Sequence, residues 1–328
     1  MPMITRTAEN SNSYSAREVS AFYDRALLER ALPALVHTRY AQVRDLPRNS
    51  GTNVIKFRKY GSLTANTTAL TQGVTPTGTS FSVTDVTATV LQYGDYVTIT
   101  DIVQMETYDP ILTETAEILG EQAGDSLDQL TRNVVAAGTT IQYASTATAD
   151  NEITAVMVLD RAEVKEAVRT LRGNNAKPVT SMIDPSTGYN TVPMGRSFIG
   201  IVSEDTLYDL DDATGWIPVE KYPNKSDVME DEQGAVGNVR FILTTNGYQL
   251  ATANLNGGPV HYTPIFGQNA YGMTRISGES LKNIVKPLGS AGTADPLDQR
   301  STSGWKATFV AKILNQDFLV VVHHGVTA

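Results

Sequence analysis

The chain has 328 residues, of which 41% are hydrophobic and 19% are charged, and its formal net charge is −9. This length predicts one large or two medium-sized domains with sizeable cores. The absence of cysteine excludes disulfides, zinc–thiolate sites and a catalytic thiol. The acidic balance argues against general nucleic-acid binding, because proteins that grip phosphate backbones are usually basic. The longest dense apolar stretch near the end, Phe318 to Val322, is too short to span a bilayer, so no membrane partner is expected.

Residues 1–50 form a basic segment without a core of its own, which we interpret as an N-terminal arm. Residues 1–60 hold ten Lys or Arg against five Asp or Glu, a net charge of +5, so the remainder carries −14. Ser15 and Glu18 make a capping-box pair that predicts the start of a helix. Such an arm could bind nucleic acid, the acidic body of a neighbouring copy, or only water. The candidate interface residues of the arm are Arg17, Arg25, Arg30 and Arg39.

Residues 51–104 are predicted to form an extended hairpin. Alternation over residues 53–60 and the Thr, Val and Tyr content of residues 81–100 predict two strands. The stretch between them, residues 61–84, is rich in Thr, Gly, Asn and Ser and contains no charged residue. A loop of this length is unusual in a compact domain, and an isolated hairpin is only marginally stable. We therefore expect its tip, with Thr71, Gln72 and Gly73, to lie over a neighbouring subunit.

The strongest predicted helix begins after Asp109 and Pro110, within a region assigned to residues 105–150. Asp suits the N-cap and Pro the first helical position. Apolar residues recur every three or four positions until Gly138, which predicts a rod of roughly 40 Å. A second, acidic stripe suggests ion pairing with the basic arm, within or between subunits. The helix dipole alone could favour the first two of its five members, which are Glu114, Glu117, Glu121, Asp125 and Asp128.

The rest of the chain predicts an α/β lobe over residues 151–290 and a returning β segment over residues 291–328. Helices are expected over residues 160–172 and 204–210, and buried strands over residues 197–203 and 240–245. After Asn315 and Gln316, the apolar run that begins at Phe318 predicts a hairpin that closes the chain. His323 and His324 are expected at a solvent-exposed strand end, because neighbours on a strand point to opposite faces and suit a shared metal poorly.

The sequence contains none of the patterns that mark a nucleophile elbow, a phosphate-binding loop, a dinucleotide turn or a zinc-protease helix. We therefore expect no catalytic residue, no cofactor site and no metal site, and a protein that is not an enzyme.

Several short segments of the sequence resemble the major capsid proteins of tailed bacteriophages, in the branch typified by coliphage N4. They begin at Phe22 (FYDRALLERA), Gln92 (QYGDYVTITD), Trp216 (WIPVEKY), Gly237 (GNVRF) and Asp295 (DPLDQR). The order of parts also resembles the α+β Hong Kong 97-type capsid fold. That fold has an N-arm, a hairpin called the E-loop, a long spine helix, an A-domain and a P-domain that both halves of the chain complete.

The resemblance implies a structural subunit that self-assembles as pentamers and hexamers into an icosahedral shell around double-stranded DNA, without sequence-specific DNA binding. It implies a virion protein assembled in the host cytoplasm, with a portal and possibly a decoration protein as partners. Because about 14 residues precede the first expected helix, a separate scaffolding protein is the favoured arrangement. Two alternatives remain open. One is an encapsulin-like compartment shell, and the other is a carbohydrate-active protein of a phage tail or surface, which two tryptophans suit poorly.

Overall fold

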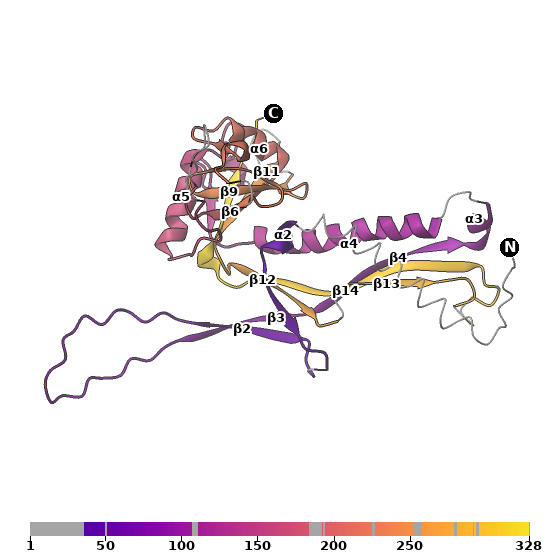
Figure 1. Ribbon diagram of the computed structural model, residues 1–328, viewed down its shortest axis with the longest axis horizontal. Helices are drawn as coiled ribbons and strands as arrows, with labels where there is room; N and C mark the ends of the chain where they lie inside the picture. The colour runs from indigo at the N-terminus through magenta and orange to yellow at the C-terminus, as the bar shows by residue number, and fades with distance from the viewer. Residues whose placement is uncertain are drawn as a thin grey trace.

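The computed structural model describes residues 36–49, 51–106, 111–183, 192, 194–224, 227–251, 258–278, 281–290, 292 and 295–327. It shows a head of strands and helices at one end of a long, thin body, with a narrow hairpin projecting from the base of the body (Figure 1). The helix expected from Ser15, and with it Arg17, Arg25 and Arg30, lies outside the described residues. The mixture of helices and strands confirms the predicted α+β class.

The body is built on one long strand, β14 (Arg300–Ile313). Its first ten residues pair antiparallel with β4, and its last four pair with β12. On its other edge β14 pairs with β13. The sheet order is β1-β12-β14-β13, with β4 also on β14. The partner strands are β1 (Gln42–Leu46), β4 (Leu91–Thr100), β12 (Tyr271–Ile276) and β13 (Leu281–Lys286).

Helix α4 (Ile111–Ala136) lies along this sheet, as Figure 1 shows. Its 26 residues span about 39 Å at 1.5 Å per residue. The structure confirms the predicted apolar stripe, because Leu119, Ala123 and Leu127 are buried against the inward side chains of β14. Gly304 allows the close approach of β4, since a Cβ there would lie 2.8 Å from the Asp95 carbonyl oxygen. A short helix, α3 (Asp101–Glu106), connects β4 to the approach to α4.

The hairpin consists of β2 (Val54–Tyr60) and β3 (Val83–Thr89), which pair antiparallel in full register. This confirms the two expected strands and their pairing. The paired part is shorter than the predicted hairpin region of residues 51–104, because β4 joins the body sheet instead. Beyond Tyr60 and Val83 the chain continues as an open loop without further strand pairing.

The head contains a second sheet of eight strands, in the order β5-β15-β11-β6-β9-β8-β7, with β10 also on β11. The central strand β6 (Phe198–Val202) is buried at all five positions, which confirms the buried strand expected there. Its side chains alternate between two cores, one containing Phe198 and Val202 and the other Ile199 and Ile201. The remaining strands are β5 (Ile141–Tyr143), β7 (Ile217–Pro218), β8 (Glu232–Val236), β9 (Val239–Leu243), β10 (Tyr248–Leu250), β11 (Val260–Phe266) and β15 (Leu319–His324).

Helices cover the two faces of the head sheet. The helices α5 (Arg161–Gly173) and α6 (Glu204–Asp211) pack on the Phe198 face. Asp160 caps α5, because its Oδ1 accepts from the backbone N–H groups of Ala162 and Glu163. The other face packs against the end of α4 and the short helix α2 (Val36–Arg39). Both helices of the predicted α/β lobe are thus confirmed.

The expectation that a hairpin closes the chain is wrong. Strands β14 and β15 do not pair, because the turn around Asn315 sends the chain from the body sheet into the head sheet. There β15 lies between β11, its antiparallel partner, and β5, its parallel partner. The last residues of the returning segment, 291–328, therefore complete the head and not the body. Local spacing could not reveal this, since two neighbouring apolar runs look alike whether they share a sheet or not.

Candidate functional site

The loop at the hairpin end is the most exposed part of the described chain that carries large apolar side chains. Thr71, Gln72 and Gly73 form the turn at its tip, where Thr71 O accepts from Val74 N at 3.2 Å. Gly73 has φ +78°, a backbone conformation that side chains disfavour. Leu70 is 74% exposed and Val74 is 63% exposed, so this loop has no core within its own subunit. Whether it contacts a second subunit stays a prediction.

The root of the hairpin is held more firmly. Arg58 Nε donates to Asp85 Oδ1 at 2.9 Å across the two strands, and this hydrogen bond lowers the pKa of the Asp85 carboxyl. Lys59 Nζ donates to Asn315 Oδ1 at 2.7 Å and lies 3.5 Å from Asp317 Oδ2. These contacts hold the root of the hairpin against the turn that joins the body to the head. They set the direction in which the hairpin leaves the body, but they do not reach its tip.

The acidic stripe on α4 divides into two parts. Glu114 and Glu121 are exposed to solvent, and Glu117 is half-buried. Asp125 and Asp128 instead face the head. Asp125 Oδ1 accepts from Asn246 Nδ2 at 2.6 Å, and its other oxygen accepts from Gln129 on the same helix. The outer part of the stripe therefore lies at the surface, whereas the inner part is hydrogen-bonded to the head.

Asp128 is fully buried, although its position on an acidic helix face predicts exposure. Its Oδ1 accepts from the backbone N–H of His37 at 2.7 Å, and its Oδ2 lies 2.8 Å from His37 Nδ1. Asn246 Nδ2 adds a third contact at 3.2 Å, and Tyr271 donates to the carbonyl oxygen of His37 at 2.6 Å. Asp128 was predicted as an interface residue, but its burial removes it from the surface that a second subunit could reach. The end of the arm does meet the acidic helix, through a histidine and a backbone amide and not through an arginine.

Arg39 lies away from α4. Its guanidinium nitrogens are 3.3 Å from Glu230 Oε2 and 3.3 Å from Asp231 Oδ2, in the loop before β8. These carboxylates were expected to be plain loop charges, and no local pattern linked them to Arg39. Of the four arginines predicted to meet the acidic stripe, the single described one is paired with the head of its own subunit.

The two terminal histidines are buried, so the expectation of a solvent-exposed pair is wrong. They do point to opposite sides of β15, as expected for neighbours on a strand. His323 Nδ1 lies 2.5 Å from Asp150 Oδ1, and His324 Nε2 lies 2.9 Å from Thr263 Oγ1. Burial lowers the pKa of His324 to about 3, which keeps it neutral. Within the described ranges, no three His, Asp or Glu side chains converge as metal ligands.

Among the described residues, no helix combines the length and apolar character needed to cross a bilayer.

Comparison of sequences identifies no relative. No family model matches the chain, and no curated protein matches it.

Comparison of structures gives a different result. The capsid of Ralstonia phage GP4 superposes with a TM-score of 0.67 at 12% identity, over 88% of this chain and 91% of that one. The capsid of cyanophage Pam1 gives 0.60 at 15% identity, over 90% and 93%. The capsid of cyanophage P-SCSP1u gives 0.59 at 12% identity, over 88% and 87%.

Each of these likenesses covers nearly nine-tenths of the chain, so each includes residues of both the body and the head. They agree with the order of parts read from the sequence, in which a hairpin and a long helix precede an α/β lobe. The chain has the Hong Kong 97-type capsid fold.

Proposed function

We propose that this protein is the major shell subunit of a tailed bacteriophage, and that copies of it assemble as pentamers and hexamers into an icosahedral capsid around double-stranded DNA. The role is structural, and no catalytic step is assigned to any residue.

The observation that carries the proposal is the likeness to phage capsid chains over almost the full length of both partners, 88% and 91% for Ralstonia phage GP4. A likeness limited to the body would leave the head, a large share of the chain, unmatched. Coverage on this scale supports a shared manner of use as well as a shared architecture, although function belongs to surfaces and must be tested there.

The surface of the subunit supports the same role. The loop of residues 61–82 exposes apolar side chains that nothing in its own subunit covers, Leu70 and Val74 among them. Exposed apolar patches of this kind mark contact sites in soluble proteins. We propose that the hairpin tip lies over a neighbouring subunit, with Thr71, Gln72 and Gly73 in the contact.

The alternatives are less favoured. A virus-like particle from Pyrococcus furiosus gives a TM-score of 0.50 at 11% identity, below the phage capsids named above, so a compartment shell of the encapsulin kind is the weaker interpretation. A carbohydrate-active tail protein would need a carboxylate pair in an aromatic cleft. The capsid fold gives no support to that interpretation.

The same proposal includes a separate scaffolding protein and a portal as partners, with a decoration protein as a further candidate, and assembly in the host cytoplasm. DNA is enclosed without sequence-specific contacts, which is consistent with the net charge of −9.

Negative-stain electron microscopy of the purified protein, with and without a co-expressed scaffolding protein, tests the proposal. Closed shells, or sheets and tubes of hexamers, are the expected result. A fixed small oligomer under both conditions, such as a trimer, would contradict it.

A further inference from the structure

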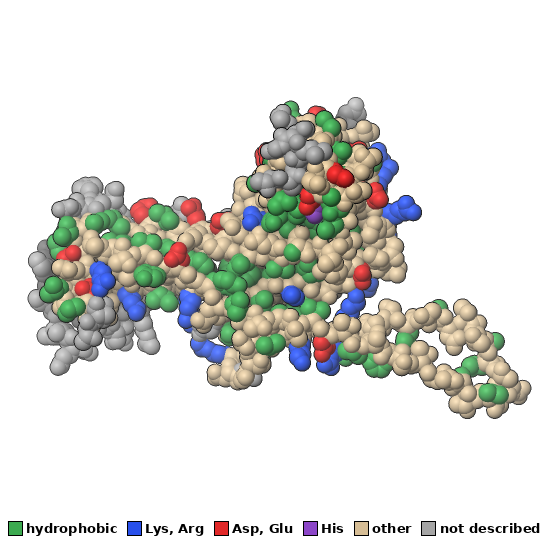
Figure 2. All heavy atoms as spheres, turned by 180° about the vertical axis from the view of Figure 1, so that it is seen from behind, with side chains coloured by type: hydrophobic (Ala, Val, Ile, Leu, Met, Phe, Trp, Pro, Cys, Tyr) green, Lys and Arg blue, Asp and Glu red, His purple; other side chains and the backbone are tan. Residues whose placement is uncertain are grey.

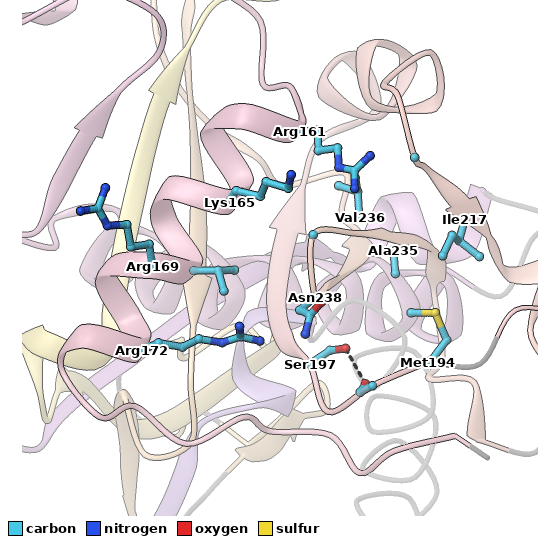
Figure 3. A pocket seen from close by; sticks show the side chains of 14 residues that line it. Arg161, Lys165, Arg169, Arg172, Met194, Ser197, Ile217, Ala235, Val236 and Asn238 are labelled. Carbon is cyan, nitrogen blue, oxygen red and sulfur yellow. Dashed lines mark hydrogen bonds between the residues drawn. The ribbon is translucent and has the colours of Figure 1, made fainter. Parts of the chain in front are cut away.

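An open groove of about 560 Å³ lies beside α5 in the head, and its wall carries four cationic side chains. They recur at every third or fourth position and therefore share one side of the helix. Figure 3 shows the first two and the last one directed over the groove, while the third lies further out and points away. The four residues are Arg161, Lys165, Arg169 and Arg172.

These cations have no counter-charge nearby. No described Asp or Glu lines the groove, and within the described ranges none of the four forms an ion pair. Of the two acidic residues on α5, Glu163 is turned away, because its carboxylate accepts from Gln142 Nε2 and from Ser145 N, and Glu166 does not line the groove. Figure 2 shows Lys and Arg side chains at the outer edge of the head, on the side where Figure 1 places α5. Four unpaired positive charges on one rigid helix predict a negatively charged partner.

The opposite charge gathers around α6, at a second groove of about 530 Å³. Glu204, Tyr208 and Asp211 stand at positions i, i+4 and i+7 and share one exposed helix face. Asp212 and Glu220 extend this acidic surface, and no described Lys or Arg lines it. Tyr208 is 72% exposed although it belongs to a folded helix. Exposed tyrosines beside charged groups are typical of the energetic centres of interfaces, and a tyrosine ring also accepts a guanidinium on its face.

The two grooves open on different sides of the edge strands β7 and β8. Their linings alternate there, because Ile217 lines the basic groove, whereas Trp216 and Pro218 line the acidic one. Neighbouring residues of a strand point to opposite faces. Ser197, directly before β6, also lines the basic groove, and Glu204, beyond the other end of β6, lines the acidic one. The two surfaces therefore face different directions and are open to two different neighbours.

We propose that the acidic face of α6 in one copy docks on the basic groove of α5 in the next copy, so that heads join head to tail. This inference rests on the proposed shell function and names the surfaces that would join subunits in a ring. A contact between unlike surfaces is heterologous, and it closes into a ring when the rotation between copies permits. A two-fold contact would pair the same two surfaces twice across one axis and would stop at the dimer, so the number of linked copies distinguishes the two arrangements.

The dimensions of the two surfaces agree. The basic side chains span residues 161–172, about 16 Å along α5, and the acidic ones span residues 204–212, about 12 Å along α6. Each surface presents four exposed charges. Those of the acidic surface are Glu204, Asp211, Asp212 and Glu220. Phosphate groups of a nucleic acid could also fill the basic groove, but they would leave the acidic face and Tyr208 without a partner. A second copy satisfies both surfaces at once.

The chain has no cysteine, so two introduced thiols can report the contact without competition. Glu166→Cys on α5 and Asp205→Cys on α6 place thiols beside the two surfaces, at exposed positions that line neither groove. Concentrated protein is treated with a short bis-maleimide and separated on a denaturing gel. A head-to-tail contact links each copy to two others, so we expect a ladder that ends at five or six copies. Each single-cysteine variant should stop at the dimer.

Charge changes in the double-cysteine background then test the chemistry. Arg161→Glu with Arg172→Glu should remove most of the ladder, and adding Glu204→Arg with Asp211→Arg should restore it. Lys286→Glu with Lys312→Glu changes the net charge equally at exposed sites on the body, and this control should leave the ladder unchanged. High salt should shorten the ladder, because screening weakens such contacts.

Each outcome has a separate meaning when the same preparations are viewed by electron microscopy. A ladder without shells supports this contact and counts against the shell function. Shells without a ladder overturn this contact and leave the shell function standing. Loss of bound nucleic acid from the Arg161→Glu, Arg172→Glu variant, with no ladder from the parent protein, overturns the contact and assigns the groove to phosphates.

Discussion

The head sheet and the hairpin are both made of strands, yet they differ in how completely one subunit can stabilise them. Strand β6 is buried at every position and contributes to two cores. Strand β2 has no fully buried residue, and the loop beyond it exposes Leu70 and Val74. A strand without a core on either face gains little from its own chain. The strands of the head are therefore stabilised within the subunit, whereas the loop of the hairpin leaves its apolar side chains exposed.

Truncation in the head core should have the largest effect on stability. Phe241→Ala removes a fully buried ring that packs among the side chains of α5, β6 and β15. We expect the free energy of unfolding to fall by about 3–5 kcal/mol, as for other large-to-small core changes. Chemical denaturation monitored by circular dichroism measures this loss. A loss below about 1 kcal/mol would mean that the head is less tightly packed than its burial indicates.

Asp128→Ala should have the next largest effect, because it leaves the buried N–H of His37 without its acceptor and removes one of the two carboxylate contacts of the Asn246 amide. The expected loss is about 1–3 kcal/mol, the usual cost of an unsatisfied buried group. Glu121→Ala, on the exposed half of the same helix, is the matched control and should change stability by less than about 0.5 kcal/mol. Equal effects would contradict the division of the acidic stripe.

Acid should weaken the head through its neutral histidines. Burial lowers the pKa of His324 to about 3, and it also lowers the pKa values of His261 and His323. The unfolded chain binds protons below its ordinary histidine pKa of about 6.5, whereas folded His324 does not until about pH 3. Stability from His324 is therefore complete above about pH 6.5 and falls by about 1.4 kcal/mol per pH unit below it. The slope of unfolding free energy against pH should be shallower in His324→Gln.

Deletion of residues 61–84 should change monomer stability least of all and assembly most of all. The deleted residues are almost all exposed, and their contacts, such as the Phe81 ring beside Tyr60, lie at the end of the hairpin, so the melting temperature of the soluble protein should change little. Shell formation should be lost, which particle counts by electron microscopy would reveal. Normal shells from this variant would show that the hairpin tip has no role between subunits.

The same contrast explains what sequence patterns could predict. Helix α5, strand β6 and the pairing of β2 with β3 follow from local periodicity and capping residues, and they were predicted correctly. The partner strands of β15 could not be predicted, because a turn of a few residues at Asn315 does not record which sheet comes next. The burial of Asp128 was also hidden, since a carboxylate on an acidic helix face looks solvent-exposed until His37 and Asn246 are brought to it.

For the two candidate surfaces, too, the sequence shows which residues are charged, but only the structure shows how they are arranged. The regular spacing of Arg161, Lys165, Arg169 and Arg172 is visible in the printed sequence, but its meaning depends on the turn between β8 and β9 that completes the groove. The acidic face of α6 is equally visible, as carboxylates on and after the helix expected over residues 204–210. Only the folded head shows that the two clusters face different directions.

The position of β15 also bears on how fast the head can fold. Residues Leu319–His324 form an inner strand between β5 and β11, and Val321 pairs with Ile141, about 180 positions earlier in the chain. The entropy of closing so long a loop opposes folding before the non-local contacts form. We therefore expect the head sheet to form late, after the local helices and the hairpin of β2 and β3.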